Sequence, residues 1–195
     1  MDHVLRVFIA EDEAIILRSF ISAVEKMGHT VAGFALDGVE ASRKIQELNP
    51  DLVLIDINMP AKDGLTVIRE SCSQQMIPVI IITGYFSDKL VERANQDCVF
   101  AYLMKPVNNQ QLEAAINVAW SKYRQWLATT QQAKDLHIAL EDRKKIERAK
   151  GILMDCFALK ESEAMARLQK MSREKNKKLA VIAAEIIDAQ KKLLQ

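Results

Sequence analysis

The stretch DLVLIDINMPAKDG, residues 51–64, decides the fold class of this chain of 195 residues. Its first part, Leu52 to Ile57, is apolar at every position except Asp56. A short apolar run of this kind is typical of a strand that is buried on both faces. Pro60 and Gly64 then mark a loop. Because strands buried on both faces occur in parallel sheets that helices cover, the stretch predicts an α/β fold.

The same alternation continues on both sides of this stretch. Strand-like runs are expected at residues 4–10, 31–34, 52–57, 79–83 and 99–104. Helices are expected between them, at residues 13–27, 38–48, 65–73 and 87–96, with Gly28 and Asn49-Pro50 as stop signals. Five strands that alternate with helices predict a (βα)5 doubly wound parallel sheet with helices on both faces.

After Pro106 the sequence carries helical patterns alone. A helix that starts near Asn108 meets neither Gly nor Pro until Gly151. Apolar or small residues recur along it with the 4,3 spacing of a heptad seam, at Leu112, Ile116, Ala119, Tyr123, Trp126, Thr130, Ala133, His137 and Leu140. The first turns can pack on the sheet as its last helix, and the extension can pair with a second copy of the chain. We expect both. Tyr123 and Trp126 lie at the centre of the seam.

Two further helix-like segments follow, at residues 162–173 and 178–190. The sequence therefore predicts three parts: a sheet domain at 1–120, a coiled-coil linker helix at 121–135 and a small three-helix all-α domain at 136–195. Residues 1–107 hold 10 Lys and Arg against 15 Asp and Glu, whereas residues 108–195 hold 17 against 11. This asymmetry indicates two modules with different partners, although chance fluctuation could also produce it.

Composition narrows the class of protein further. Hydrophobic residues make up 49% of the chain and charged residues 27%, which is typical of a globular protein. No apolar run reaches the ~18 residues that span a bilayer, and Arg6, Glu11 and Asp12 interrupt any signal-peptide core. The three cysteines, Cys72, Cys98 and Cys156, are odd in number and far apart. We therefore expect no disulfide framework, no membrane partner and a location in a reducing cytoplasm.

Polar side chains stand at the carboxyl ends of four predicted strands, where ligands of open parallel sheets gather. Glu11 and Asp12 follow the first strand, Asp56 ends the third, Thr83 ends the fourth and Lys105 follows the fifth. Carboxylate oxygens are hard donors that suit Mg²⁺. A carboxylate between Mg²⁺ and a lysine can act as a nucleophile toward phosphorus. Each residue alone is weak evidence, but together they predict a site that forms an aspartyl phosphate.

With these residues in view, residues 1–120 resemble the receiver domain of bacterial two-component response regulators, a flavodoxin-like fold. The stretches that carry the resemblance are FIAEDEA (8–14), DLVLIDINMPAKDG (51–64), VIIITGY (79–85) and YLMKP (102–106). The resemblance implies a sensor histidine kinase as partner and Mg²⁺ as cofactor. It implies Asp56 as the phosphoacceptor, and a metal site formed by Glu11, Asp12 and Asp56 with the backbone carbonyl of Asn58.

The resemblance also assigns the residues that respond to the phosphoryl group. Thr83 and Lys105 would hold it, and Tyr102, three residues before Lys105, would be the switch aromatic whose hydroxyl moves when Thr83 is drawn toward phosphate. The chain would not be an enzyme in the ordinary sense, although the receiver would take part in its own phosphoryl transfer and hydrolysis.

Basic residues cluster in the rear helices. Five of them lie close together, at Arg143, Lys144, Lys145, Arg148 and Lys150. Such a cluster is often only a solvated helix face, but Lys and Arg also supply affinity for phosphates. The rear part resembles the ANTAR domain of bacterial transcription antiterminators, on the stretches LEDRKKIERAKGILM (140–154), SEAMARLQKMS (162–172) and KKLAVIAAEII (177–187). The resemblance implies an RNA-binding module whose targets are paired hairpins in leader transcripts.

The sequence thus favours a phosphorylation-controlled antiterminator that acts as a homodimer, with phosphorylation promoting the dimer. Two alternatives remain open. The rear helices could bind DNA, although the break at residues 173–178 has no Gly of the kind found in a helix-turn-helix. The chain could also be a protein-interaction adaptor without any nucleic-acid partner, which a salt titration of binding to RNA would distinguish.

Overall fold

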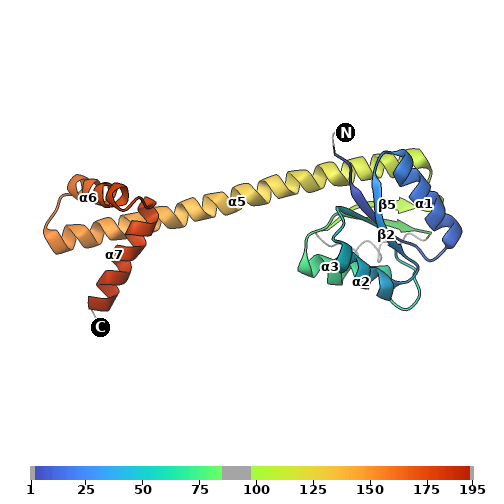
Figure 1. The fold of residues 1–195 in the computed structure, drawn as a ribbon, viewed down its shortest axis with the longest axis horizontal. Coiled ribbons are helices and arrows are strands. Elements are labelled where there is room, and N and C mark those ends of the chain that lie inside the picture. The colour runs from blue at the N-terminus through green and yellow to red at the C-terminus, as the bar shows by residue number, and fades with distance from the viewer. Residues whose placement is uncertain (1–2, 85–97, 194–195) are drawn as a thin grey trace. The chain divides into compact units, whose positions relative to one another are not determined.

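A computed structural model of the chain describes residues 3–84 and 98–193 (Figure 1). The chain divides into two compact units, Met1–Leu127 (unit 1) and Ala128–Gln195 (unit 2). The helix expected at residues 87–96 lies outside the described residues. Among the described residues, no helix combines the length and the apolar character that a membrane span requires.

Unit 1 is built on a five-stranded parallel sheet in the order β2-β1-β3-β4-β5. The strands are β1 (Arg6–Ala10), β2 (Thr30–Ala35), β3 (Leu52–Asp56), β4 (Val79–Thr83) and β5 (Val99–Met104). The helices that accompany them are α1 (Ala14–Lys26), α2 (Gly38–Leu48), α3 (Gly64–Gln74) and the first part of α5 (Asn109–Phe157). The expected (βα)5 flavodoxin-like architecture is therefore confirmed for the described part of the chain.

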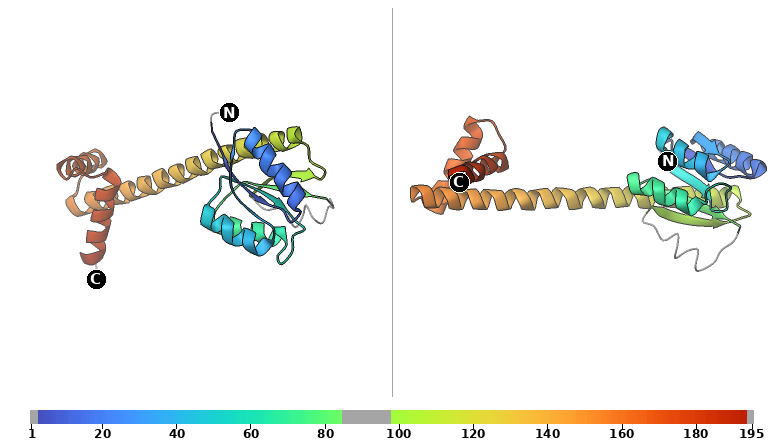
Figure 2. Two further views of the ribbon diagram at one scale, coloured as in Figure 1. Left: turned by 45° about the vertical axis from the view of Figure 1, so that its right-hand side comes forward. Right: turned by 90° about the horizontal axis from the view of Figure 1, so that it is seen from below.

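Two apolar layers hold the sheet between its helices. On one face, Phe8, Val53 and Ile55 of the sheet pack with Ala41 of α2 and Ile68 of α3. The helices α2 and α3 also contact each other, and they lie side by side below the sheet in Figure 1 and in the left view of Figure 2. The other face packs against α1 and α5, through residues that include Ile9, Leu54, Phe20 and Ile116. β3 and β4 are buried at every position, as their apolar sequences predict.

Aspartates fix where two of the helices begin. The carboxylate of Asp37 accepts a hydrogen bond from the backbone N–H of Glu40 and so caps α2, and Asp63 accepts from Thr66 N and caps α3. Such caps satisfy backbone donors that have no partner inside the helix. Both caps lie next to loops at the carboxyl edge of the sheet, so they help to set the backbone that surrounds the predicted site.

Unit 2 contains the end of α5 together with α6 (Glu161–Glu174) and α7 (Leu179–Leu193). Ala149 and Leu153 of α5 pack with Leu168 of α6 and with Ile182 and Ala183 of α7 in a small apolar core. The three expected helical segments are thus present. The middle of α5, residues 131–140, is exposed at every position. None of these ten residues is buried against the described part of the chain.

One expectation about the cysteines is wrong. Cys72 and Cys98 form a disulfide, whereas the odd and scattered cysteines argued against one. The fold brings the end of α3 next to the start of β5, which no spacing along the sequence reveals. Tyr123, expected at the centre of the seam, donates a hydrogen bond to the carbonyl oxygen of Met76 at 3.0 Å inside unit 1, and its pairing with a second copy stays a prediction. α5 therefore stays in contact with the sheet domain at least as far as this residue.

Candidate functional site

The carboxyl edge of the sheet in unit 1 brings four predicted residues together. Asp56 is the last residue of β3 and Thr83 the last of β4, while Glu11 and Lys105 directly follow β1 and β5. Since β1, β3, β4 and β5 are consecutive in the sheet, these strand ends are neighbours. Glu11, Asp56 and Thr83 are almost completely buried. Residues that are far apart in the sequence thus lie together in one compact site.

Lys105 is the central cation of this site. Its ammonium nitrogen Nζ lies 2.6 Å from Asp56 Oδ2 and 2.7 Å from Glu11 Oε1. Burial lowers the pKa of the Lys105 ammonium, but the hydrogen bonds and charges of Asp56 and Glu11 outweigh this effect, and its pKa is raised. Lys105 therefore stays charged and can neutralise a negative group on Asp56.

The environment of Glu11 disfavours its charged form, whereas that of Lys105 favours the charged form. Burial raises the pKa of its carboxyl group, and the neighbouring Asp56 charge adds to the increase, against the opposing hydrogen bond from Lys105. Its second oxygen, Oε2, is buried and has no hydrogen-bond partner among the described residues. A buried acceptor without a donor is costly. Glu11 therefore presents a carboxylate oxygen that is ready to receive a cation.

The three carboxylates form a group that could hold a metal ion. One oxygen from each of Glu11, Asp12 and Asp56 lies within 4.8 Å of the others. Asp12 is exposed, so water can reach the group, and small hard cations such as Mg²⁺ keep several waters when they bind protein oxygens. The donor chemistry and the unpartnered oxygen of Glu11 both fit Mg²⁺.

The loop after β3 is held against the strand end. The backbone N–H of Asn58 donates to Asp56 Oδ1 at 3.1 Å, and Gly64 N donates to Ile57 O at 2.9 Å. A side chain at Gly64 would place its Cβ 2.1 Å from Asp56 O, and one at Gly38 would lie 1.9 Å from Lys62 O. Only glycine fits such close approaches. These contacts fix the carboxylate of Asp56 relative to its loop.

Thr83 and Tyr102 occupy different positions relative to the cluster. Thr83 is buried, and its carbonyl oxygen accepts a hydrogen bond from Lys105 N at 2.8 Å, which ties the ends of β4 and β5 together. Tyr102 pairs with Ile81 across β4 and β5 and packs, partly buried, against the core on the α2 and α3 side of the sheet. Burial raises the pKa of its phenol. Asn58 is exposed.

A basic groove lies between α5 and α7 in unit 2. It has a volume of about 320 Å³, and its lining consists of Glu141, Lys144, Lys145, Arg148, Ala184, Ile187, Asp188 and Lys191. Three of the five basic residues expected to contact RNA therefore share one concave surface. Sequence reasoning missed Lys191, because the pattern of α7 does not reveal which of its residues face α5.

The remaining two basic residues are placed differently. Arg143 is exposed and is not part of the groove lining. Lys150 is largely buried, and its ammonium contacts Glu161 at 2.6 Å and Glu147 at 2.8 Å. These two pairings raise the pKa of Lys150. Lys150 thus links α5 to the start of α6, which is a structural role.

Comparison with known proteins gives the chain its family. A model of the response regulator receiver domain matches residues 7–117, and a model of the ANTAR domain matches residues 134–187. The transcriptional regulatory protein PdtaR of Mycobacterium tuberculosis (strain ATCC 25618 / H37Rv) is 33% identical over 183 residues, which cover 94% of this chain and 89% of that protein.

Solved structures agree for unit 1. The signal receiver domain of a modulated diguanylate cyclase from Desulfovibrio desulfuricans G20 is 30% identical, with a TM-score of 0.58, and the match covers 63% of this chain and 98% of that one. The receiver domain of the putative response regulator NarL from Mycobacterium tuberculosis is 26% identical, with a TM-score of 0.56 and coverage of 60% and 97%. The two matched domains indicate a regulatory protein. The chain belongs to the two-component response regulators that combine a receiver domain with a C-terminal RNA-binding ANTAR domain.

Proposed function

We propose that this chain is a cytoplasmic transcription antiterminator that a sensor histidine kinase controls by phosphorylating Asp56. The observation that carries the proposal is the buried Asp56 carboxylate, held 2.6 Å from the Lys105 ammonium beside the unpartnered Glu11 oxygen. This arrangement can accept a phosphoryl group, and the same chain carries a basic groove that can accept a nucleic acid. In this proposal residues 1–120 receive the signal, 121–135 form the linker and 136–195 bind RNA.

The residues of unit 1 have distinct roles in the proposed transfer. One Asp56 oxygen attacks the phosphorus of the kinase phosphohistidine, and the imidazole leaves. Lys105 balances the added charge on the phosphoryl oxygens, and the Thr83 hydroxyl donates a hydrogen bond to one of them. Mg²⁺, held by Glu11, Asp12, Asp56 and the Asn58 carbonyl, would supply further neutralisation of charge. Tyr102 then follows the movement of Thr83 and changes the surface of β5.

In unit 2, we propose that Lys144, Lys145 and Arg148, with Lys191 opposite them, contact the phosphates of a leader RNA hairpin. The groove keeps these cations on one surface, where they can neutralise neighbouring phosphates. Arg143 lies outside the groove and would contribute at its margin. Lys150 is left out of the contact set because Glu147 and Glu161 already hold its ammonium.

The dimer that the heptad seam predicts stays a proposal. Its support is the stretch of α5 at residues 131–140, in which every residue is exposed, including Ala133 and Leu140 of the seam. Charges at seam positions are poorly solvated in a closed helix pair. Ala133→Glu with Leu140→Glu should therefore yield a monomer in sedimentation of the phosphorylated chain. Gln132→Glu, which adds a charge outside the seam, should leave the dimer intact.

The decisive experiment measures binding of the full chain to RNA before and after phosphorylation by a small phosphodonor with Mg²⁺. We expect the phosphorylated chain to bind a cognate double hairpin more tightly, with a steep salt dependence, and Asp56→Asn to show no gain. Strong binding to duplex DNA without binding to RNA would establish the DNA-binding alternative instead. Binding to neither nucleic acid would favour the adaptor.

A further inference from the structure

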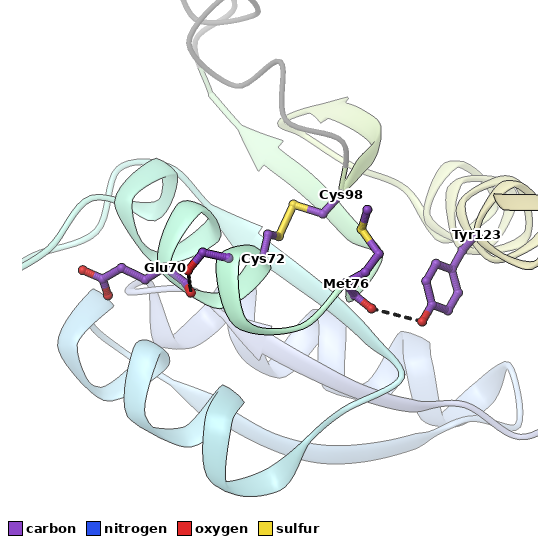
Figure 3. The surroundings of a disulfide bond; sticks show 6 residues. Glu70, Cys72, Met76, Cys98 and Tyr123 are labelled. Atoms are coloured by element: carbon purple, nitrogen blue, oxygen red, sulfur yellow. Dashed lines mark hydrogen bonds between the residues drawn. A yellow bond between two sulfur atoms is a disulfide. The ribbon is translucent and has the colours of Figure 1, made fainter. Parts of the chain in front are cut away.

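The disulfide between Cys72 and Cys98 joins two segments that are 26 residues apart in sequence (Figure 3). Cys72 lies on α3, and Cys98 directly precedes β5. The two Cα atoms are 6.3 Å apart. Cys98 is fully buried in the core between the sheet and the helices α2 and α3, whereas Cys72 is only partly buried. The third cysteine, Cys156, is exposed and free in unit 2.

Each cysteine of the disulfide is close in sequence to a residue that contacts Tyr123 of α5. Four residues after Cys72, the carbonyl oxygen of Met76 accepts the hydrogen bond from the Tyr123 hydroxyl, which Figure 3 shows. Two residues after Cys98, the ring of Phe100 meets the ring of Tyr123 edge to face, with centroids 6.0 Å apart. Tyr123 thus contacts one segment from each side of the disulfide.

Tyr123 is also flanked along α5 by two other aromatic residues. Its ring centroid lies 5.6 Å from that of Trp120 and 6.1 Å from that of Trp126. A cavity of about 220 Å³ beside it is lined in part by Gln75, Met76, Trp120 and Tyr123. The cavity gives the Tyr123 ring room to shift once its two partners move.

We propose that Cys72 and Cys98 form a reversible redox site that controls how firmly Tyr123 anchors α5 to unit 1. While the disulfide is closed, it fixes the segment that ends in Met76 relative to the segment that contains Phe100, and Tyr123 fits between them. Once it is open, the two segments lose this covalent link, and the hydrogen bond to Met76 no longer has a fixed acceptor.

The chemistry is thiol–disulfide exchange with a small dithiol, and reoxidation by a hydroperoxide. A thiolate of the dithiol attacks Sγ of Cys72, the partly exposed sulfur, and Cys98 leaves as a thiolate that takes up a proton. The second thiol of the reductant then attacks the mixed disulfide and releases Cys72. In the reverse direction one cysteine thiolate takes an oxygen from the hydroperoxide, which leaves as an alcohol, and the other thiol displaces water to close the bond.

The test uses the full chain with Cys156→Ser, so that only the two relevant thiols remain. After treatment with a hydroperoxide we expect no thiol to be alkylated under denaturing conditions, and after dithiothreitol we expect two. Reduction should raise amide hydrogen exchange at residues 119–127 about 2- to 10-fold, the range that the loss of one net hydrogen bond gives. A second hydroperoxide treatment should reverse the rise.

Two variants separate this control from a general change in stability. The Tyr123→Phe variant in the oxidised chain should already exchange fast at residues 119–127, because it lacks the hydroxyl that donates a hydrogen bond to the Met76 carbonyl oxygen. Cys72→Ser with Cys98→Ser should exchange fast whether or not dithiothreitol is present. Two alkylated thiols after the hydroperoxide treatment would overturn the proposal, and so would a disulfide that forms without any change of exchange at residues 119–127.

Discussion

The two units use charge in opposite ways. In unit 1, the side chains of Lys105, Asp56 and Glu11 are only 14%, 6% and 1% exposed, and each contacts its partner at less than 3 Å. In unit 2, Lys144 and Lys145 of the basic groove are 64% and 47% exposed, and each pairs with an acid on its own helix. A buried charge depends on each of its partners, whereas an exposed charge is screened by water and salt. Single substitutions should therefore act sharply in unit 1 and gradually in unit 2.

The largest effect is expected at Asp56. Asp56→Asn removes the nucleophilic oxygen while it keeps the shape of the side chain. We expect Mg²⁺-dependent labelling by a small phosphodonor to disappear completely, and the fold to persist in circular dichroism. Asp155→Asn, at an exposed position of unit 2, should label as the wild type does. Full labelling of Asp56→Asn would mean that another residue receives the phosphoryl group.

The second effect concerns the stability of unit 1. Lys105→Met leaves the buried carboxylates of Glu11 and Asp56 without their cation, and the loss of one partner from a buried pair costs about 3–5 kcal/mol. Urea unfolding without Mg²⁺ should show a loss of this size, and added Mg²⁺ should restore part of it. The control is Lys62→Met. Lys62 contacts Glu70 at 2.7 Å but is more exposed, so its loss should cost less than about 1 kcal/mol. Equal costs for the two variants would remove the contrast between buried and exposed charge.

A smaller and graded effect is expected in the basic groove. Lys144→Ala with Arg148→Ala should weaken binding to an RNA hairpin and lower the slope of log affinity against log salt. The expected decrease is about 0.7–0.9 for each phosphate contact that is lost. Lys170→Ala, at an exposed position of α6 outside the groove, is the matched control. An unchanged slope in the double variant would place the RNA elsewhere on unit 2.

The smallest effect concerns the turn between α6 and α7. Hydrogen bonds from Lys177 and Lys175 lower the pKa of Glu185 from 4.5 to about 2. A carboxyl whose pKa is lowered by folding contributes stability above its ordinary pKa and loses it as the pH falls toward the lowered value. In thermal melts, the melting temperature of the wild type should therefore fall between pH 5 and pH 2 as this contribution is lost. The Glu185→Gln variant should lack the contribution already at pH 6. Glu174→Gln, whose partner Lys170 is 3.8 Å away, should keep the wild-type profile.

The fold and the unit 1 site were accessible from sequence because both follow from local patterns. Buried strands such as β4 are apolar up to their last residue, and in a parallel sheet the residue at the end of each strand must lie at one edge. The positions of Asp56, Thr83 and Lys105 follow from this rule alone. The unpartnered Glu11 oxygen does not follow from it, because it depends on how the side chains finally pack.

The features that sequence missed all require knowledge of which surfaces meet. The heptad spacing at Tyr123 fits a second helix and the edge of the sheet equally well, so it does not reveal the contact with the Met76 carbonyl. Cys72 and Cys98 become neighbours because α3 and β5 flank the same core. Lys191 lines the groove because α7 packs against the end of α5, and Lys150 is held by Glu161 because α6 begins beside it.

Gly64 has a consequence for how freely this sequence can vary. Because Gly64 has no side chain, the loop can pass close to the backbone of Asp56, where a Cβ atom would lie 2.1 Å from the Asp56 carbonyl oxygen. Gly38 allows an equally close approach to the backbone of Lys62. In a library that samples every amino acid at every position, selection for folded protein alone should already remove variants at both glycines. The conservative variant Asp56→Asn, by contrast, should be removed only when phosphorylation is selected. Residues with no chemical role can thus be the least replaceable, and comparing the two selections would show it directly.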